Sequence, residues 1–188
     1  MIIHKHKFVF IHIPKCAGTS IENFFIDSLN LKRKDHVYWD DNKNQWAQHF
    51  TIRELPELEG YFKFAFVRNP WDRVVSACMY RQSDINDFLL NDYVKDIDGK
   101  KDPARHQMSQ YDFLVDKNGK LKVDFVGRFE NLQTDFDFVC DKLGISKHQL
   151  PHSNKTRHKH YSEYYSGDTK KMVAKRYARD IEYFGYEF

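Results

Sequence analysis

Hydrophobic positions along the chain come in short runs, and the spacing within each run predicts alternating strands and helices. Residues 7–13 and 62–67 are almost continuously apolar and rich in aromatic and β-branched side chains, which is typical of buried strands. Residues 19–29 and 70–93 repeat apolar residues every three or four positions, as helices with one buried face do. This alternation predicts an α/β fold with a largely parallel sheet flanked by helices, and ligands at the carboxyl ends of its strands.

A second group of elements is expected in the later half of the chain. The pair Asn118-Gly119 marks a hairpin turn, with residues 111–115 and 121–125 as its flanks. As an alternative, residues 125–129 form a short strand of their own.

The remaining segments are assigned from their polarity and spacing. Residues 31–48 are polar and predict a loop, and residues 51–59 predict a short helix. Two more helices are expected, one stopping at Gly144 and marked by Leu132, Phe136, Val139 and Leu143, the other marked by Met172, Val173, Tyr177, Ile181 and Phe184.

Composition narrows the class of protein. A chain of 188 residues with 41% hydrophobic residues favours one domain with a real core. The net charge of +3 is too small to indicate a nucleic-acid partner by itself. The charge is uneven, because residues 152–160 hold three basic residues, three histidines and no acid. An anionic ligand and a solvated basic loop explain this stretch about equally well.

Cysteine usage and hydropathy bear on the compartment. Three cysteines without close pairing, Cys16, Cys78 and Cys140, argue against a disulfide scaffold and fit a reducing compartment. The first residues carry no signal-peptide core, and no apolar run approaches the roughly 20 residues that cross a bilayer. We therefore expect a cytoplasmic protein, which could still dock on a membrane.

The stretch HIPKCAGTS, residues 12–20, lies between the first predicted strand and the first predicted helix. The first N–H groups of a helix lack internal partners, and the helix dipole adds partial positive charge there. Gly18 would let an anion approach the backbone, Thr19 and Ser20 offer hydroxyl groups, and Lys15 offers a full charge. These residue types predict a phosphate or sulfate site.

Two alternatives for this stretch stay open. Thr19 and Glu22 have the spacing of a capping box, which needs no ligand. Cys16 with His12 could form a nucleophilic pair, although no third partner has suitable spacing. The lysine of the GxxxxGK[ST] phosphate loop is missing.

The second predicted strand leads into RNPWDRVVS. Arg68 follows the strand, Asn69 suits a helix cap and Pro70 suits the first helical position. Ser76 lies off the apolar face of this helix. Arg68 and Ser76 could hold a second phosphate, but Arg68 could equally pair with Asp72.

Together, HIPKCAGTS and VRNPWDRVVS resemble sulfotransferases that use 3′-phosphoadenosine 5′-phosphosulfate (PAPS), in the carbohydrate sulfotransferase branch related to the heparan 2-O- and chondroitin enzymes. The resemblance continues through QYDFL, DFVGRFENL, LPHSNKTRHKHY and DIEYFGYEF, and so covers nearly the whole chain. It implies a single sulfotransferase domain over residues 1–188, built on a P-loop-like sheet.

The resemblance also implies roles for individual residues. In this family the first motif binds the 5′-phosphosulfate and the second binds the 3′-phosphate. Because a sulfuryl group carries less negative charge than a phosphoryl group, we expect no metal ion. The residues that match are Lys15, Ala17, Gly18, Thr19 and Ser20 for the first, Arg68 and Ser76 for the second, and Lys155 and Thr156, with Arg157 as a weaker match, in a segment that closes over the nucleotide.

A base for the acceptor hydroxyl is implied in the same way. His49 lies where the 2-O-sulfotransferase branch places its catalytic histidine, and Lys15 would act on the leaving phosphate. Glu54 and His106 are reserve candidates, and other branches use a glutamate. The resemblance favours a saccharide acceptor and gives PAP (3′-phosphoadenosine 5′-phosphate) as the product.

Other interpretations of the chain compete with this one. A nucleotide kinase or NTPase on a related scaffold, and a non-catalytic nucleotide- or glycan-binding module, remain alternatives. The pairs His4/His6 and His158/His160 could bind zinc but lack a third and fourth ligand. The tyrosines 161, 164 and 165 could either pack in the core or line the adenine or acceptor pocket.

Overall fold

The computed structural model describes residues 1–32, 39–40, 45–46, 48–81, 90, 93–94, 105–151 and 159–188. They form two compact units. The first unit is Met1–Val67 with Asp112–Ser153, and the second is Arg68–Tyr111 with Asn154–Phe188. A single domain over residues 1–188 stays a prediction.

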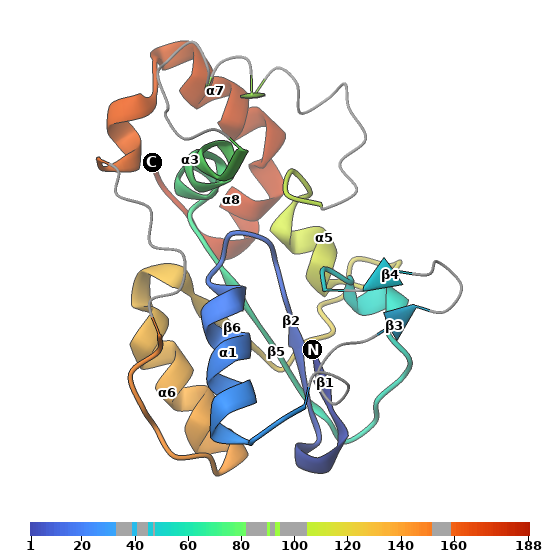
Figure 1. Ribbon diagram of the computed structural model, residues 1–188. Helices are drawn as coiled ribbons and strands as arrows, with labels where there is room; N and C mark the ends of the chain where they lie inside the picture. Colours follow the sequence, from blue (N-terminus) through green and yellow to red (C-terminus); the bar gives the residue numbers. More distant parts are fainter. Residues whose placement is uncertain are drawn as a thin grey trace. The chain divides into compact units, whose positions relative to one another are not determined.

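A four-stranded sheet forms the centre of the first unit (Figure 1). Its order is β1-β2-β5-β6, with β1 at Ile2–Ile3, β2 at Phe8–Ile11, β5 at Phe62–Val67 and β6 at Phe125–Arg128. β2, β5 and β6 are parallel, and only β1 runs antiparallel to its neighbour. The expected α/β fold with a largely parallel sheet is confirmed, as is the separate strand proposed near residue 125.

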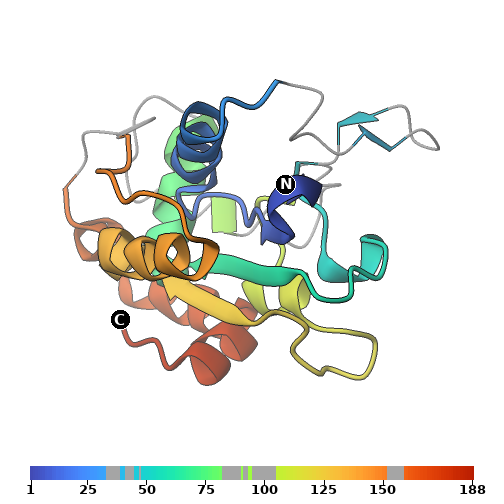
Figure 2. The same ribbon diagram turned by 90° about the horizontal axis from the view of Figure 1, so that it is seen from below.

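Phenylalanines fill the space between this sheet and two helices, α1 (Gly18–Ser28) and α6 (Leu132–Leu143). Phe25 of α1 packs on Phe8 of β2 with ring centroids 4.7 Å apart, and Phe24 meets Phe136 of α6 at the same distance. Figure 2 shows α6 running alongside β5 and β6. Each buried phenylalanine contributes about 1.5–3 kcal/mol, so this aromatic layer holds α1 and its preceding loop on the sheet.

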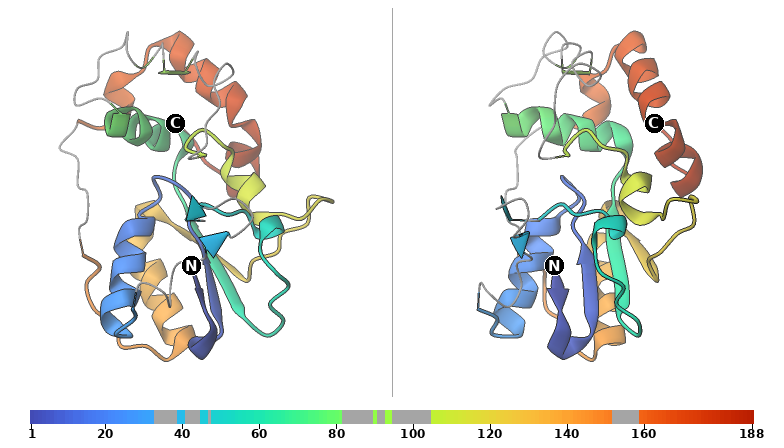
Figure 3. Two further views of the ribbon diagram at one scale, coloured as in Figure 1. Left: turned by 45° about the vertical axis from the view of Figure 1, so that its right-hand side comes forward. Right: turned by 90° about the vertical axis from the view of Figure 1, so that its right-hand side faces the viewer.

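Helices make up most of the second unit: α3 (Pro70–Arg81), η5 (Tyr161–Tyr164), α7 (Gly167–Arg176) and α8 (Ala178–Phe184). Trp71, Val75 and Cys78 of α3 pack with Val173 of α7 and with Tyr177. Figure 3 shows these helices from two sides. The apolar face predicted for α3 is therefore confirmed.

Two predictions for the later half of the chain need correction. Residues 111–115 are not a hairpin strand, because Gln110–Leu114 forms helix α5, and a single antiparallel bridge, Val115 to Leu121, flanks the Asn-Gly turn. The final helix is broken at Tyr177, whose backbone (φ −107°, ψ 28°) leaves the helical region. The Tyr177 hydroxyl donates to the carbonyl oxygen of Gln107 at 3.0 Å, so its side chain is held in the core at this break.

Shorter elements also differ from the expectation. Only Ile52–Glu54 is helical in the segment 51–59, as the 3₁₀ turn η2, before Pro56 follows. The predicted loop over residues 31–48 contains two short paired strands, β3 (Trp39–Asp40) and β4 (Gln45–Trp46). Two further 3₁₀ turns are η1 (His4–His6) and η4 (Phe129–Asn131).

Candidate active site

The loop between β2 and α1 has an unusual backbone. Lys15 (φ 68°) and Ala17 (φ 64°) both adopt the left-handed conformation, although neither is glycine. Such residues cost about 1–2 kcal/mol each and persist where surrounding structure holds them. The carbonyl oxygen of Ala17 accepts the N–H groups of Ser20 (3.0 Å) and Ile21 (3.2 Å). The loop is therefore a strained turn that ends directly at the amino terminus of α1.

The capping box considered for Thr19 and Glu22 is wrong. The N-cap of α1 is Ala17, and no side chain caps the helix. Glu22 instead binds elsewhere: its Oε1 lies 2.9 Å from Nδ1 of His12, and its Oε2 accepts from Nε2 of Gln48 at 3.1 Å. Among the described residues, the N–H groups of Gly18 and Thr19 have no acceptor. These two groups match what an anion at a helix amino terminus requires.

Gly18 is needed for a reason the sequence does not reveal. A Cβ atom at this position would lie 2.1 Å from the imidazole ring of His12. The His12 ring therefore packs directly on the Gly18 backbone. This packing requires a glycine even without a bound anion.

The His12–Glu22 pair is largely buried, with side-chain exposures of 5% and 14%. Burial disfavours the ionised carboxylate, but the hydrogen bond and charge of His12, the amino terminus and Gln48 together outweigh it. The pKa of Glu22 is consequently held below its usual value. Glu22 is thus an ionised residue of α1 that binds His12, at the start of the HIPKCAGTS stretch.

His49 lies beside this loop within the first unit. Its Nδ1 is 3.1 Å from the carbonyl oxygen of His12, and the two imidazole rings meet edge to face with centroids 4.6 Å apart. Because a carbonyl oxygen can only accept, Nδ1 carries the proton, and Nε2 of the neutral ring is then a proton acceptor. His49 is therefore in the tautomer that a general base at Nε2 needs.

The reserve base candidates have other contacts. The carboxylate of Glu54 accepts from the N–H (3.0 Å) and the hydroxyl (2.9 Å) of Thr51, which forms the capping box of η2. His106 belongs to the second unit, where its carbonyl oxygen accepts from Nη2 of Arg73 and its ring meets Tyr80. Of the three candidates, His49 and Glu54 share the unit of the first motif, and His49 contacts the motif itself.

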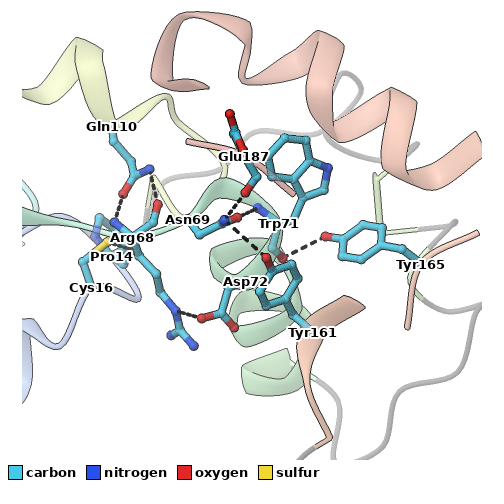
Figure 4. A network of polar contacts seen from close by, with 10 residues as sticks. All are labelled: Pro14, Cys16, Arg68, Asn69, Trp71, Asp72, Gln110, Tyr161, Tyr165 and Glu187. Atoms are coloured by element: carbon cyan, nitrogen blue, oxygen red, sulfur yellow. Dashed lines mark hydrogen bonds and ion pairs between the residues drawn. The ribbon is translucent and has the colours of Figure 1, made fainter. Parts of the chain in front are cut away.

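The second motif is organised around Arg68, which is 6% exposed. Its Nε donates to Oδ2 of Asp72 at 2.8 Å, so the pairing considered from the sequence is confirmed (Figure 4). A guanidinium has five N–H donors, and the contact with Asp72 uses the one at Nε. Asn69 accepts the N–H of Trp71 at 3.1 Å through Oδ1, as expected of a helix cap.

Ser76 lies in α3 one turn beyond Asp72, the residue that binds Arg68. Ser76 is 8% exposed, and no hydrogen bond of its hydroxyl group occurs among the described residues. A nearly buried hydroxyl with no hydrogen bond among those residues, one turn from the partner of an arginine, suits the second phosphate contact that the sequence predicts.

Two residues that sequence reasoning did not assign prove central to the second motif. Gln110 binds the backbone of Arg68, and Asp180 binds Gln110 in turn. Their signals in the sequence were the stretches QYDFL and DIEYFGYEF, which resemble the sulfotransferase family but gave no role from residue type alone.

Some predicted site residues fall outside the described ranges. Lys155, Thr156 and Arg157 lie in residues 152–158, which the structure does not describe, and so does His158. Their roles stay predictions.

The alternatives based on metals and on the tyrosine cluster can be compared with the structure. In the described part of the chain, no three His, Cys, Asp or Glu side chains gather as metal ligands would. Nδ1 of His4 instead lies 2.8 Å from the Tyr61 hydroxyl. Tyr165 donates to the carbonyl oxygen of Trp71 at 2.8 Å and is packed in the second unit.

The three cysteines are buried free thiols. Burial, followed by the charges of Asp137 and Asp141, raises the pKa of Cys140 to about 11, which makes this thiol unreactive at neutral pH. Sγ of Cys16 lies 3.6 Å from the carbonyl oxygen of Pro14. The Cys16 thiol is thus buried and packed against the backbone of its own loop.

Lys15, Ala17, Gly18, Thr19, Ser20 and His49 thus belong to the first unit, where His49 contacts His12 of the same loop. Arg68 and Ser76 belong to the second. The fold is an α/β fold, and each unit contains residue types that anion-binding sites use: a left-handed loop before a helix amino terminus in the first, and an arginine in the second. The model of the sulfotransferase family matches residues 1–187, and the chain belongs to that family.

Several relatives of the chain are carbohydrate sulfotransferases. The chain is 21% identical to carbohydrate sulfotransferase 14 of Danio rerio over 99% of its length, and 25% identical to carbohydrate sulfotransferase 9 of Homo sapiens over 94%. It spans 61% and 47% of the lengths of these two relatives. An uncharacterised protein of Archaeoglobus fulgidus is 36% identical over 47% of the chain and 72% of its own length. No solved structure gave a significant match.

No helix within the described ranges combines the length and apolarity required to cross a membrane.

Proposed function

We propose that this chain is a PAPS-dependent O-sulfotransferase that transfers a sulfuryl group to a saccharide hydroxyl. Support comes from its membership of the sulfotransferase family and its similarity to carbohydrate sulfotransferases. The structural observation that carries the proposal is the left-handed backbone of Lys15 and Ala17 directly before α1. A left-handed residue joined to a helical one forms the concave backbone that binds anions.

By residue type, the donors of the two motifs correspond to the two anionic groups of PAPS. The N–H groups of Gly18 and Thr19, the hydroxyls of Thr19 and Ser20 and the ammonium group of Lys15 would hold the 5′-phosphosulfate. Arg68 and Ser76 would hold the 3′-phosphate. Lys155 and Thr156 would close over the nucleotide.

The reaction requires little covalent chemistry from the protein. The acceptor oxygen attacks sulfur in line, the bond from sulfur to the bridging phosphate oxygen breaks, and PAP leaves with the electron pair. By analogy with phosphoryl transfer, positioning and electrostatic stabilisation supply the rate enhancement. Lys15 would stabilise the negative charge that develops on the leaving phosphate.

His49 would accept the proton of the attacking hydroxyl at Nε2. The hydrogen bond from Nδ1 to the carbonyl oxygen of His12 fixes the required tautomer and also stabilises the imidazolium that forms. Because His49 is hydrogen-bonded to the loop that contains Lys15, its position is tied to that of the group proposed to bind the sulfuryl donor.

Ligand-induced thermal stabilisation tests the proposal directly. The melting temperature is measured with PAP, with 5′-AMP and with ATP–Mg²⁺. A ligand at a hundred times its dissociation constant adds about 2.7 kcal/mol to the free energy of unfolding. For a chain of this size the melting temperature should rise by roughly 5 to 10 °C.

Each result has a distinct meaning. A rise with PAP that exceeds the rise with 5′-AMP supports a binding site for the 3′-phosphate. No rise with PAP, or a larger one with ATP–Mg²⁺, contradicts the proposal and favours the nucleotide kinase alternative.

A further inference from the structure

Two stretches without a role in the proposed function meet in the second unit. Gln110 begins α5 and Asp180 lies in α8, 70 residues further along the chain. Both side chains are completely buried. A buried carboxylate and a buried amide are costly unless their hydrogen bonds are satisfied, so their partners reveal what they hold in place.

Gln110 holds the backbone of Arg68 at two points. Its Oε1 accepts the N–H of Arg68 at 2.8 Å, and its Nε2 donates to the carbonyl oxygen of Arg68 at 2.8 Å (Figure 4). Arg68 is the first residue after β5, and the pairing of β5 with β6 ends at Val67. The amide of Gln110 therefore replaces a strand partner and fixes the direction in which the Arg68 side chain leaves the backbone.

Asp180 holds Gln110 in the same manner. Its Oδ2 accepts the N–H of Gln110 at 2.9 Å and lies 3.4 Å from Nε2 of the same residue. Its Oδ1 accepts the N–H of Tyr111 at 2.9 Å and the hydroxyl of Ser109 at 2.5 Å. One carboxylate thus satisfies the first N–H groups of α5 and orients the amide that holds Arg68.

We propose that Asp180 is a positioning residue for the nucleotide: through Gln110 it fixes the Arg68 backbone so that the guanidinium meets the 3′-phosphate. The inference rests on the proposed function, which assigns this phosphate to Arg68. It also gives the stretches QYDFL and DIEYFGYEF a common purpose, because each contributes one member of the chain of contacts.

Charge and positioning predict opposite effects when Asp180 is changed. Asp180→Asn removes a negative charge from the unit that would bind an anion, and Coulomb attraction alone would then make PAP bind more tightly. The amide of asparagine also replaces one acceptor with a donor, which faces the N–H groups of α5. Loss of positioning makes PAP bind more weakly.

The experiment measures dissociation constants of PAP and 5′-AMP by titration calorimetry. Asp180→Asn and Gln110→Met should weaken PAP binding by about tenfold, the loss typical when a residue that orients a ligand-binding group is removed. Binding of 5′-AMP, which lacks the 3′-phosphate, should not change. Glu182→Gln is the matched control, since Glu182 is an exposed carboxylate of the same helix; it should bind both ligands as the wild type does.

Three results would overturn the inference. PAP binding to Asp180→Asn at wild-type strength or tighter shows that Arg68 needs no such support. Equal losses for PAP and 5′-AMP show a general structural role. Absence of PAP binding by the wild type refutes the proposed function itself, and the inference with it. If Asp180→Asn does not fold, Gln110→Met decides, because it leaves the bonds of Asp180 to Ser109 and to the backbone in place.

Discussion

The two candidate phosphate motifs reach their geometry by different routes. The loop before α1 is shaped by its own backbone, through left-handed Lys15 and Ala17 and the bonds of Ser20 and Ile21 to Ala17. Arg68 is held by side chains: Asp72, four residues further along, and from distant parts of the chain Gln110 and, through Gln110, Asp180. We propose that the loop before α1 binds the phosphosulfate, where the reaction takes place. Arg68, held by other side chains, would bind the 3′-phosphate and so contribute to nucleotide affinity.

Under the proposed function, turnover depends on the motif in the first unit, and affinity for the 3′-phosphate depends on the motif in the second. The largest effect is expected at His49. His49→Ala should slow sulfuryl transfer from PAPS by about 10²–10⁴-fold, because the acceptor hydroxyl loses its base, while PAP binding is unchanged. Release of PAP in the presence of a panel of saccharides measures turnover. His4→Ala, an exposed histidine of the same unit, is the control, and undiminished transfer by His49→Ala would exclude His49 as the base.

Lys15→Ala should reduce turnover by about 10²–10³-fold, since charge on the leaving phosphate is no longer stabilised. The dissociation constant of PAP, measured by calorimetry, should change far less than the rate. Lys5→Ala, at an exposed lysine in η1, controls for loss of charge. A loss of PAP affinity as large as the loss of rate would show that Lys15 acts only in binding.

Arg68→Met should show the opposite behaviour. Loss of charged hydrogen bonds to the 3′-phosphate costs about 1.5–3 kcal/mol, and PAP affinity should fall by roughly 10- to 100-fold. Affinity for 5′-AMP should stay at its wild-type value in the same titrations. Arg176→Met removes an equal charge from the exposed face of α7 and should bind PAP normally. Parallel losses for the two nucleotides would break the distinction between the motifs.

Gly18→Ala tests how closely His12 packs on the first loop. The added Cβ would lie 2.1 Å from the His12 ring, so ring or helix must move. The free energy of unfolding should fall by about 1–3 kcal/mol, measured by urea denaturation. Gly167→Ala is the control, because a Cβ there meets nothing within 4 Å and its φ is not positive. Equal stability of the two variants would contradict the close packing.

The smallest effect is expected from the ionised carboxylate of Glu22. Its pKa is lower in the folded state than in the unfolded chain, so its stabilising contribution is complete above the unfolded value of about 4.3 and is lost as the pH falls through the folded value. Glu22→Gln should therefore lower the free energy of unfolding at pH 7 and match the wild type in acid. Urea denaturation at both pH values measures this, with exposed Glu59→Gln as control. A difference that persists in acid would assign the effect to packing.

Regular elements could be predicted where one segment contains its own signal. The apolar runs of β2 and β5 and the helical spacing of α1 and α6 correspond closely to the observed bounds. The local pattern predicts a hairpin strand over residues 111–115, but Gln110–Leu114 forms a helix, because Asp180 satisfies the first N–H groups of α5 from another part of the chain. The break at Tyr177 has no signal in the local apolar spacing either.

The sequence by itself indicated the parallel sheet, the loop rich in phosphate-binding residue types and the candidates Lys15, Arg68 and Ser76, because local spacing and residue chemistry are readable along the chain. His49 became a candidate only through the family resemblance. Tertiary structure alone decided that Gly18 accommodates His12, that Glu22 binds His12 rather than capping α1, and that Gln110 and Asp180 support Arg68. These contacts join residues up to 70 positions apart. No local pattern specifies such a pair, since burial and hydrogen-bond geometry arise only when the chain is folded.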